Sequence, residues 1–134
     1  NHDSQCRHLH GHRYALEVTL GGPVVTTAGA ADEGMVIDFS AVKAIARERV
    51  VDPWDHAFLA WRHDRAVTTF LDGIPGHRTV LFDAPPTAEH LAQTAFAILD
   101  RAYRERYGDS LRLERVRLYE TPNCWADALR GETP

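Results

Sequence analysis

The chain has 134 residues, of which 44% are hydrophobic and 25% are charged, and its formal net charge is −4. This length fits a single domain over residues 1–134, with enough chain to bury a core. The acidic balance gives no basic surface for nucleic acid or an anionic membrane. No apolar run approaches the roughly 18 residues that span a bilayer. Two cysteines, Cys6 and Cys124, do not make a disulfide framework, so we expect free thiols in a reducing cytoplasm.

The first half of the chain predicts two strands and a helix. Apolar and polar residues alternate over residues 13–20, which is typical of a half-buried strand. The apolar run at residues 35–39 predicts a short strand that pairs back onto the first. Apolar residues then recur at helical spacing over residues 40–51, with Asp38 or Ser40 available as the N-cap.

The middle of the chain is richer in breakers. Pro53 is well placed to open a short turn or helix. Residues 61–86 contain several glycines and prolines around one strand-like run, TVLF. We therefore expect a long excursion that carries one short strand.

The last third predicts the longest helix and a final strand. Thr87 is its expected N-cap and Gly108 its expected end, with a stripe of apolar residues between them. Residues 111–121 alternate as a strand does, and a loop through Trp125 should follow. Hairpins with segregated helices indicate an α+β fold, with both helices on one face of an antiparallel sheet. The exposed edges of so small a sheet favour pairing between subunits.

The densest group of chemical side chains is the stretch CRHLHGH at residues 6–12. On an extended strand, residues two apart lie about 6.6 Å from each other, so the rings of His10 and His12 can reach one ion. His8 and His12 would lie about 13 Å apart, which strains three-way ligation. A catalytic zinc site needs three protein ligands, so at least one must come from elsewhere. The alternative is that these histidines are ordinary surface or hydrogen-bonded residues.

Four other residues have more than one interpretation. Cys6 is a ligand, a small buried residue or, as thiolate, a base. Asp55 beside His56 forms an acid/base pair only if a turn lets adjacent side chains meet, and chance occurrence is the alternative. Glu120 continues the apolar face of the last strand. There it either receives a bidentate donor, such as a pterin or guanine edge, or is solvated because the strand has ended.

Five segments occur in an order that resembles the 6-pyruvoyl-tetrahydropterin synthase / 6-carboxytetrahydropterin synthase family. They are CRHLHGHRY, GMVIDFSAVK, DHAFL, PTAEHLA and VRLYETPNCWA. The resemblance implies the tunnelling fold, a four-stranded antiparallel sheet with two helices on one side. It also implies that subunits join edge to edge into barrels, commonly as a homo-hexamer of two stacked trimers with active sites between subunits.

The resemblance implies roles for residues at matching positions. His10 and His12 correspond to two zinc-binding histidines, so the expected cofactor is Zn²⁺. Cys6 corresponds to the catalytic cysteine, a general base. Asp55 and His56 match an Asp–His pair that completes a triad with a cysteine from another subunit.

Three further residues are implied to bind the substrate. Glu120 corresponds to the residue that grips the pterin ring, and Thr87 and Glu89 to a turn near that pocket. From its sequence alone, Glu89 most simply complements the dipole of the helix that follows.

The three residues between Cys6 and His10 are typical of the bacterial 6-carboxytetrahydropterin synthases of queuosine synthesis. We therefore expect a cytoplasmic lyase that converts 7,8-dihydroneopterin triphosphate to 6-carboxy-5,6,7,8-tetrahydropterin, releasing acetaldehyde and triphosphate. The alternatives are a pyruvoyl-type synthase and a non-catalytic oligomer that binds a pterin or purine.

The sequence departs from the family at three places. The third zinc histidine and much of the first strand are expected upstream of residue 1. Residues 61–86 form a longer excursion than in compact members, and Trp54 stands where leucine is usual.

Overall fold

The computed structural model describes residues 10–132. Within them the helices and strands follow in the order β1 (Ala15–Gly21), α1 (Phe39–Ala46), the π-helical turn η2 (Arg47–Val51), α2 (Asp52–Trp54), β2 (Phe58–Trp61), α3 (Arg65–Asp72), β3 (Thr79–Phe82), α4 (Ala88–Tyr107), the 3₁₀ turn η3 (Gly108–Ser110), β4 (Arg112–Thr121) and β5 (Cys124–Leu129). None of these helices is long and apolar enough to cross a membrane.

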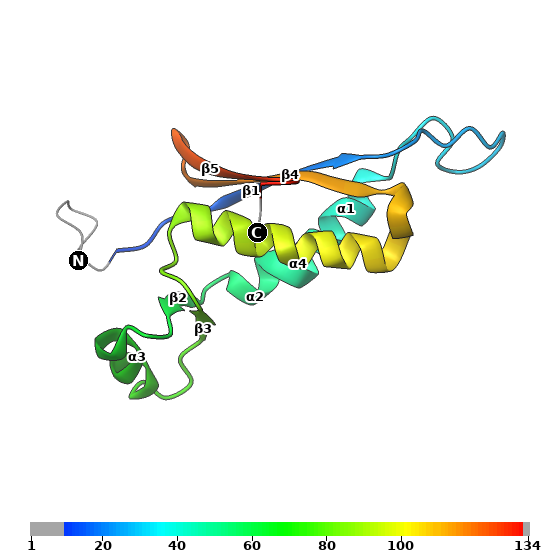
Figure 1. Cartoon of the computed structure of the whole chain (residues 1–134). Helices are drawn as coiled ribbons and strands as arrows, with labels where there is room; N and C mark the ends of the chain where they lie inside the picture. The colour runs from blue at the N-terminus through cyan, green and yellow to red at the C-terminus, as the bar shows by residue number, and fades with distance from the viewer. Residues whose placement is uncertain (1–9, 133–134) are drawn as a thin grey trace.

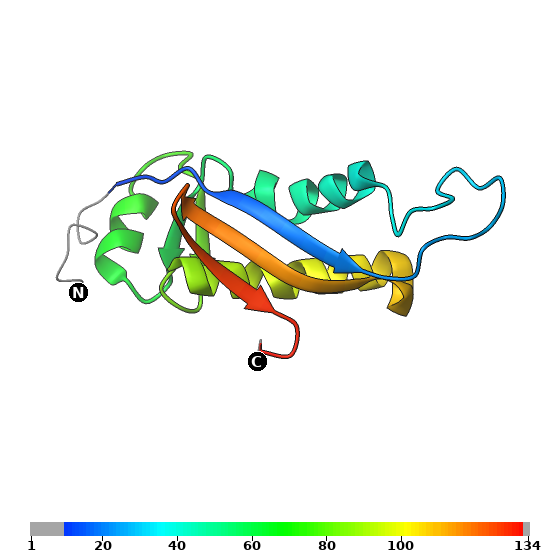
Figure 2. The same cartoon turned by 90° about the horizontal axis from the view of Figure 1, so that it is seen from above.

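An antiparallel sheet and the long helix α4 make up the main layers. The strand order is β1–β4–β5, with Val18 opposite Val116 and Leu118 opposite Ala126. The helices lie on one side of this sheet, and α4 runs beneath β4 and β5 (Figures 1 and 2). The predicted α+β class with helices on one face is confirmed. In the described part of the chain, however, this sheet has three strands rather than four.

Helix α4 forms where the sequence predicted it. The hydroxyl of Thr87 accepts a hydrogen bond from the backbone N–H of His90 at 3.4 Å, and Gly108 ends the helix with φ +64°. An N-cap and a residue with positive φ are the usual ends of a helix. Its buried stripe faces the sheet, and Leu91 and Leu99 are fully inaccessible to solvent.

Asp38 begins a second helical run. Its carboxylate accepts a hydrogen bond from the backbone N–H of Ser40 at 2.6 Å, and this bond lowers the pKa of the carboxyl group. The chain continues through α1, η2 and α2 without leaving helical geometry. Tyr103 of α4 donates a hydrogen bond to the carbonyl of Val42 at 3.0 Å and so ties the two helical segments together.

The predicted strand at residues 35–39 is wrong. Met35 and Gly34 bond to Val25 within their own loop, and the helix already begins at Phe39. Gly34 has a φ of +83°, and this left-handed turn folds the segment onto itself instead of onto β1. An apolar run alone therefore did not distinguish a strand from a locally closed loop.

The excursion holds more structure than expected. Besides the predicted TVLF strand, now β3, it contains helix α3, and β3 pairs in parallel with β2. The expected loop through Trp125 is also wrong, because that residue lies in β5, opposite Tyr119 of β4. A two-residue connection between Thr121 and Cys124 returns the chain along β4 as a hairpin.

Candidate functional site

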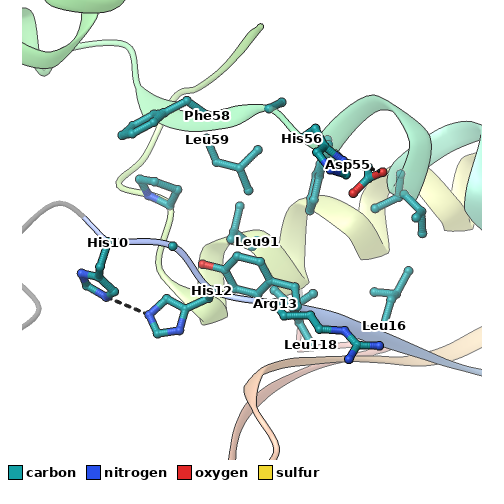
Figure 3. Close-up of a pocket in the computed structure, with 17 residues that line it drawn as sticks. His10, His12, Arg13, Leu16, Asp55, His56, Phe58, Leu59, Leu91 and Leu118 are labelled. Atoms are coloured by element: carbon teal, nitrogen blue, oxygen red, sulfur yellow. Dashed lines mark hydrogen bonds and ion pairs between the residues drawn. The ribbon is translucent and has the colours of Figure 1, made fainter.

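A pocket of about 710 Å³ opens beside the segment that leads into β1. This volume is within the usual range for small-molecule sites, roughly 300–1,000 Å³. Its apolar wall comes from three elements of the fold, represented by Leu16 of β1, Leu91 of α4 and Leu118 of β4 (Figure 3). Its polar side chains come from the segment before β1 and from the turn between α2 and β2.

His10 and His12 converge on the wall of this pocket. Their Nε2 atoms lie 2.8 Å apart, a hydrogen-bond distance in which one ring donates and the other accepts (Figure 3). Two imidazole nitrogens on one tetrahedral zinc ion would lie about 3.3 Å apart, given Zn–N bonds of about 2.0 Å. The pair therefore needs only a small separation to fit a metal ion between the two rings.

Glu120 lies next to these histidines. Its Oε1 is 3.7 Å from Nε2 of His12, an ion-pair distance. The register of β4 against β5 shifts between Tyr119 and Thr121, so Glu120 occupies an irregularity of the ladder. Such irregularities re-aim side chains at the end of a strand. Burial, together with the Glu120 carboxylate, raises the pKa of the Tyr14 phenol above its ordinary value.

The side chains of Asp55 and His56 are in contact, although adjacency in the sequence alone did not determine this. Nδ1 of His56 lies 3.0 Å from Oδ2 of Asp55. The two side chains meet because His56 has a φ of +54°, the one non-glycine residue in the left-handed region among residues 10–132. Left-handed backbone at a non-glycine residue is costly and gathers at functional sites. Both residues line the pocket, yet the His56 side chain is 90% exposed.

Thr87 and Glu89, like Glu120, do not line the pocket, whereas His10, His12, Asp55 and His56 do. The pocket wall includes Pro86 and Leu91, which are neighbours of Thr87 and Glu89. Glu89 accepts hydrogen bonds from its own backbone N–H and from the Thr87 hydroxyl, and these bonds lower the pKa of its carboxyl group. In this structure both residues build the first turn of α4, and their role in substrate binding stays a prediction.

The metal ligand set is partial in the described residues. Cys6, the predicted base, lies outside them. Within residues 10–132 there is no group of three or more histidine, cysteine, aspartate or glutamate side chains that could hold a metal ion. His10 and His12 could supply two of the three protein ligands of a catalytic zinc site, and no third ligand is grouped with them in the described part of the chain.

Three residues of the site were not selected from the sequence. Tyr14 shares the strand face of His12, and this two-residue spacing could have identified it. Trp54 was noted only as a departure from the family; it lines the pocket and packs edge-to-face on Phe82 of β3, with ring centroids 5.3 Å apart. Arg78 bonds to the backbone around Asp55, and nothing in the local sequence indicates that contact.

Comparison with known proteins gives a consistent picture. Over 128 residues the chain is 29% identical to the 6-carboxy-5,6,7,8-tetrahydropterin synthase of Rickettsia felis and 31% identical to that of Haemophilus influenzae. These alignments cover 94% of this chain and 86% and 85% of the two relatives. A probable 6-carboxy-5,6,7,8-tetrahydropterin synthase of Halobacterium salinarum is 32% identical over 122 residues, covering 91% of this chain and 71% of that protein.

The fold has a counterpart among solved structures. The crystal structure of an uncharacterized protein from Wolinella succinogenes superposes with a TM-score of 0.73 at 22% identity, covering 93% of this chain and 81% of that one. Residues 1–130 match the protein family described as 6-pyruvoyl tetrahydropterin synthase. The prediction of a lyase-type pterin-synthase enzyme is thereby confirmed at the level of the family. The chain belongs to the 6-pyruvoyl tetrahydropterin synthase family.

Proposed function

We propose that the protein is a zinc-dependent 6-carboxytetrahydropterin synthase. It would convert 7,8-dihydroneopterin triphosphate to 6-carboxy-5,6,7,8-tetrahydropterin, with release of acetaldehyde and triphosphate, as a step toward queuosine. The observation that carries the proposal is one pocket lined by both the paired Nε2 atoms of His10 and His12 and the Asp55–His56 contact. The names of the relatives at 29–32% identity support the same reaction.

His10 and His12 are the residues that would hold the zinc ion. The chemistry such an ion supplies is Lewis-acid polarisation of the substrate's side-chain hydroxyls. Asp55 accepts the Nδ1–H of His56 and fixes the ring, leaving Nε2 to take up or deliver a proton. Cys6 is the proposed base for the other proton transfer.

Glu120 is the proposed anchor for the pterin ring. Its carboxylate lies 3.7 Å from Nε2 of His12, so a pterin bound to it would lie next to the two imidazoles. Anchoring of this kind places the reacting carbon against the catalytic groups and reduces the entropy lost on reaction. Replacement of Glu120 by glutamine should weaken substrate binding more than it slows turnover.

An oligomer with shared active sites is part of the proposal. In the described residues, β1 and β5 each pair with β4 alone, so each leaves one edge open for a neighbouring subunit. The Asp55–His56 pair is strongly exposed in the single chain and lies apart from His10 and His12 (Figure 3). That arrangement suits a pair that completes a site with the cysteine of another subunit.

Incubation of zinc-loaded protein with 7,8-dihydroneopterin triphosphate tests the reaction. Acetaldehyde together with a carboxypterin is the expected outcome. A pyruvoyl product would support a pyruvoyl-type synthase instead, and binding without turnover would support a non-catalytic pterin-binding oligomer.

Replacement of His56 by asparagine is the sharpest companion variant, because asparagine tolerates left-handed backbone and should preserve the turn. We expect kcat to fall on the order of 10²- to 10⁴-fold, as for the loss of an acid/base group. The matched control is His63→Asn, an exposed histidine that does not line the pocket. Equal activities of the two variants would contradict the role given to His56.

A further inference from the structure

Arg78 holds the backbone that leads into the Asp55–His56 turn. It immediately precedes β3, at the far end of the excursion. Its guanidinium donates hydrogen bonds to three carbonyl oxygens, those of Asp52 at 2.6 Å, Pro53 at 3.1 Å and Asp55 at 3.2 Å. These carbonyls end the helical run of α1, η2 and α2, where backbone acceptors have no partner in the next turn.

The main chain of Arg78 also holds the other side of the turn. Its carbonyl accepts a hydrogen bond from the N–H of Phe58 at 2.9 Å, at the start of β2. The two residues between these contacts are His56 and Ala57. One residue therefore fixes the chain both before and after His56.

The hydrogen bonds of Arg78 on both sides of His56, here called the clamp, account for the left-handed backbone of His56. A non-glycine residue keeps such a conformation only when its surroundings over-determine it. Arg78 supplies those surroundings with a planar group whose several N–H donors reach different acceptors at once. Its positive charge also suits the C-terminal end of a helix, where the carbonyl dipoles converge.

We propose that Arg78 is a positioning residue, which orients the His56 imidazole against Asp55 without touching the substrate itself. The proposal rests on the proposed function, because it assigns His56 the proton transfer described above. It also assigns a role to the excursion at residues 61–86, since Arg78 and β3 both belong to this segment. The packing of the Trp54 ring on the Phe82 ring also joins α2 to β3.

Replacement of Arg78 by lysine tests the proposal. A lysine keeps the charge but, as a single ammonium on a flexible stem, cannot hold three carbonyls in a fixed plane. We expect kcat to fall on the order of 10- to 100-fold, the size of effect that a misplaced catalytic group produces, while KM changes by less than about threefold. Arg78→Gln should show a larger loss of the same kind.

Arg62→Lys is the matched control. Arg62 directly follows β2 and pairs with the exposed Asp83 at 2.6 Å, so it belongs to the same excursion and makes no contact with the turn. This variant should retain wild-type kcat. Equal kcat values for Arg78→Lys and Arg62→Lys would overturn the proposal.

A double-variant cycle separates positioning from general structural damage. If Arg78 acts through His56, Arg78→Lys should lose its effect on kcat in a His56→Asn background. Multiplication of the two losses, or a rise in KM as large as the fall in kcat, would contradict positioning.

A measurement that does not depend on turnover tests the positioning role of Arg78 separately from the proposed synthase activity. In ¹⁵N-histidine-labelled protein, the Nδ1 signal of His56 should change in Arg78→Lys and remain unchanged in Arg62→Lys. If the wild type makes no carboxypterin but the signal changes as expected, the proposed function fails and the clamp stands. If the wild type is active and the signal does not change, the clamp fails and the function stands.

Discussion

The packed core between α4 and the three-stranded sheet differs sharply from the excursion at residues 61–86, which carries Arg78. The first is held by packed hydrocarbon, with Leu99, Tyr103 and Val116 fully inaccessible to solvent. In the excursion, by contrast, Phe70 is 63% and Leu81 49% exposed, and polar contacts such as those of Arg78 fix the chain. The comparison teaches that the stability of the core and the geometry of the Asp55–His56 turn come from different regions, so substitutions should separate them.

The largest expected effect is on activity, at the pocket. His12→Ala removes one of two convergent imidazoles and with it several kcal/mol of transition-state stabilisation, so turnover should fall about 10³-fold or more. Zinc content measured by elemental analysis should fall as well, while the thermal midpoint of the zinc-free protein stays near that of wild type. His63→Ala is the control, and zinc retained in full by His12→Ala would contradict the ligand assignment.

The next largest effect is on stability, in the core between α4 and the sheet. Leu99→Ala leaves a cavity between α4 and the sheet and should lower the free energy of unfolding by about 2–5 kcal/mol. Phe70→Ala in α3 removes a mostly exposed side chain and should change it by less than about 0.5 kcal/mol. Urea denaturation measures both. Similar losses in the two variants would erase the distinction between the regions.

A smaller effect is expected at the N-terminus of α4, beside the pocket. Thr87→Ala removes the side chain that caps α4 and should cost about 1 kcal/mol of unfolding free energy. If this residue only caps the helix, KM for the pterin should stay unchanged. A rise in KM without loss of stability would instead support the substrate-binding role implied by the family resemblance.

The smallest effect depends on pH. The pKa of Glu89 is lowered in the folded protein, so its ionised form stabilises the fold above the usual carboxyl pKa. That contribution is lost as pH falls through the lowered value. Glu89→Gln should therefore be less stable than wild type at neutral pH and equal to it in strong acid, as measured by urea denaturation. A difference that persists unchanged in acid would exclude this origin.

Local signals predicted much of the core layer. Helix α4 with its ends at Thr87 and Gly108 and the strands β1 and β4 follow from spacing and capping chemistry, and Asp38 is one of the two N-caps that the sequence offered. The apolar run at residues 35–39 misled because a turn at Gly34 closes that loop on itself. The sequence predicted too little structure in the excursion, because α3 and the parallel strands depend on contacts between segments distant in sequence.

Four of the predicted site residues, His10, His12, Asp55 and His56, line the pocket, but their arrangement could not be predicted. Histidines two apart on an extended chain must lie close, and their Nε2 atoms do meet. Contact between the adjacent Asp55 and His56 needs a left-handed residue, which a two-letter motif does not reveal. Arg78 lies 23 residues from Asp55 along the chain, so its hydrogen bond to that carbonyl depends on the tertiary fold.

The left-handed conformation of His56 has a consequence for any mutational scan. A β-branched replacement such as valine changes the main chain and removes the imidazole together, so its phenotype mixes misfolding with lost chemistry. Glycine and asparagine isolate the chemical contribution, because they tolerate the same dihedral angles. At this position, then, the ranking of substitutions by tolerance should follow backbone preference rather than similarity to histidine.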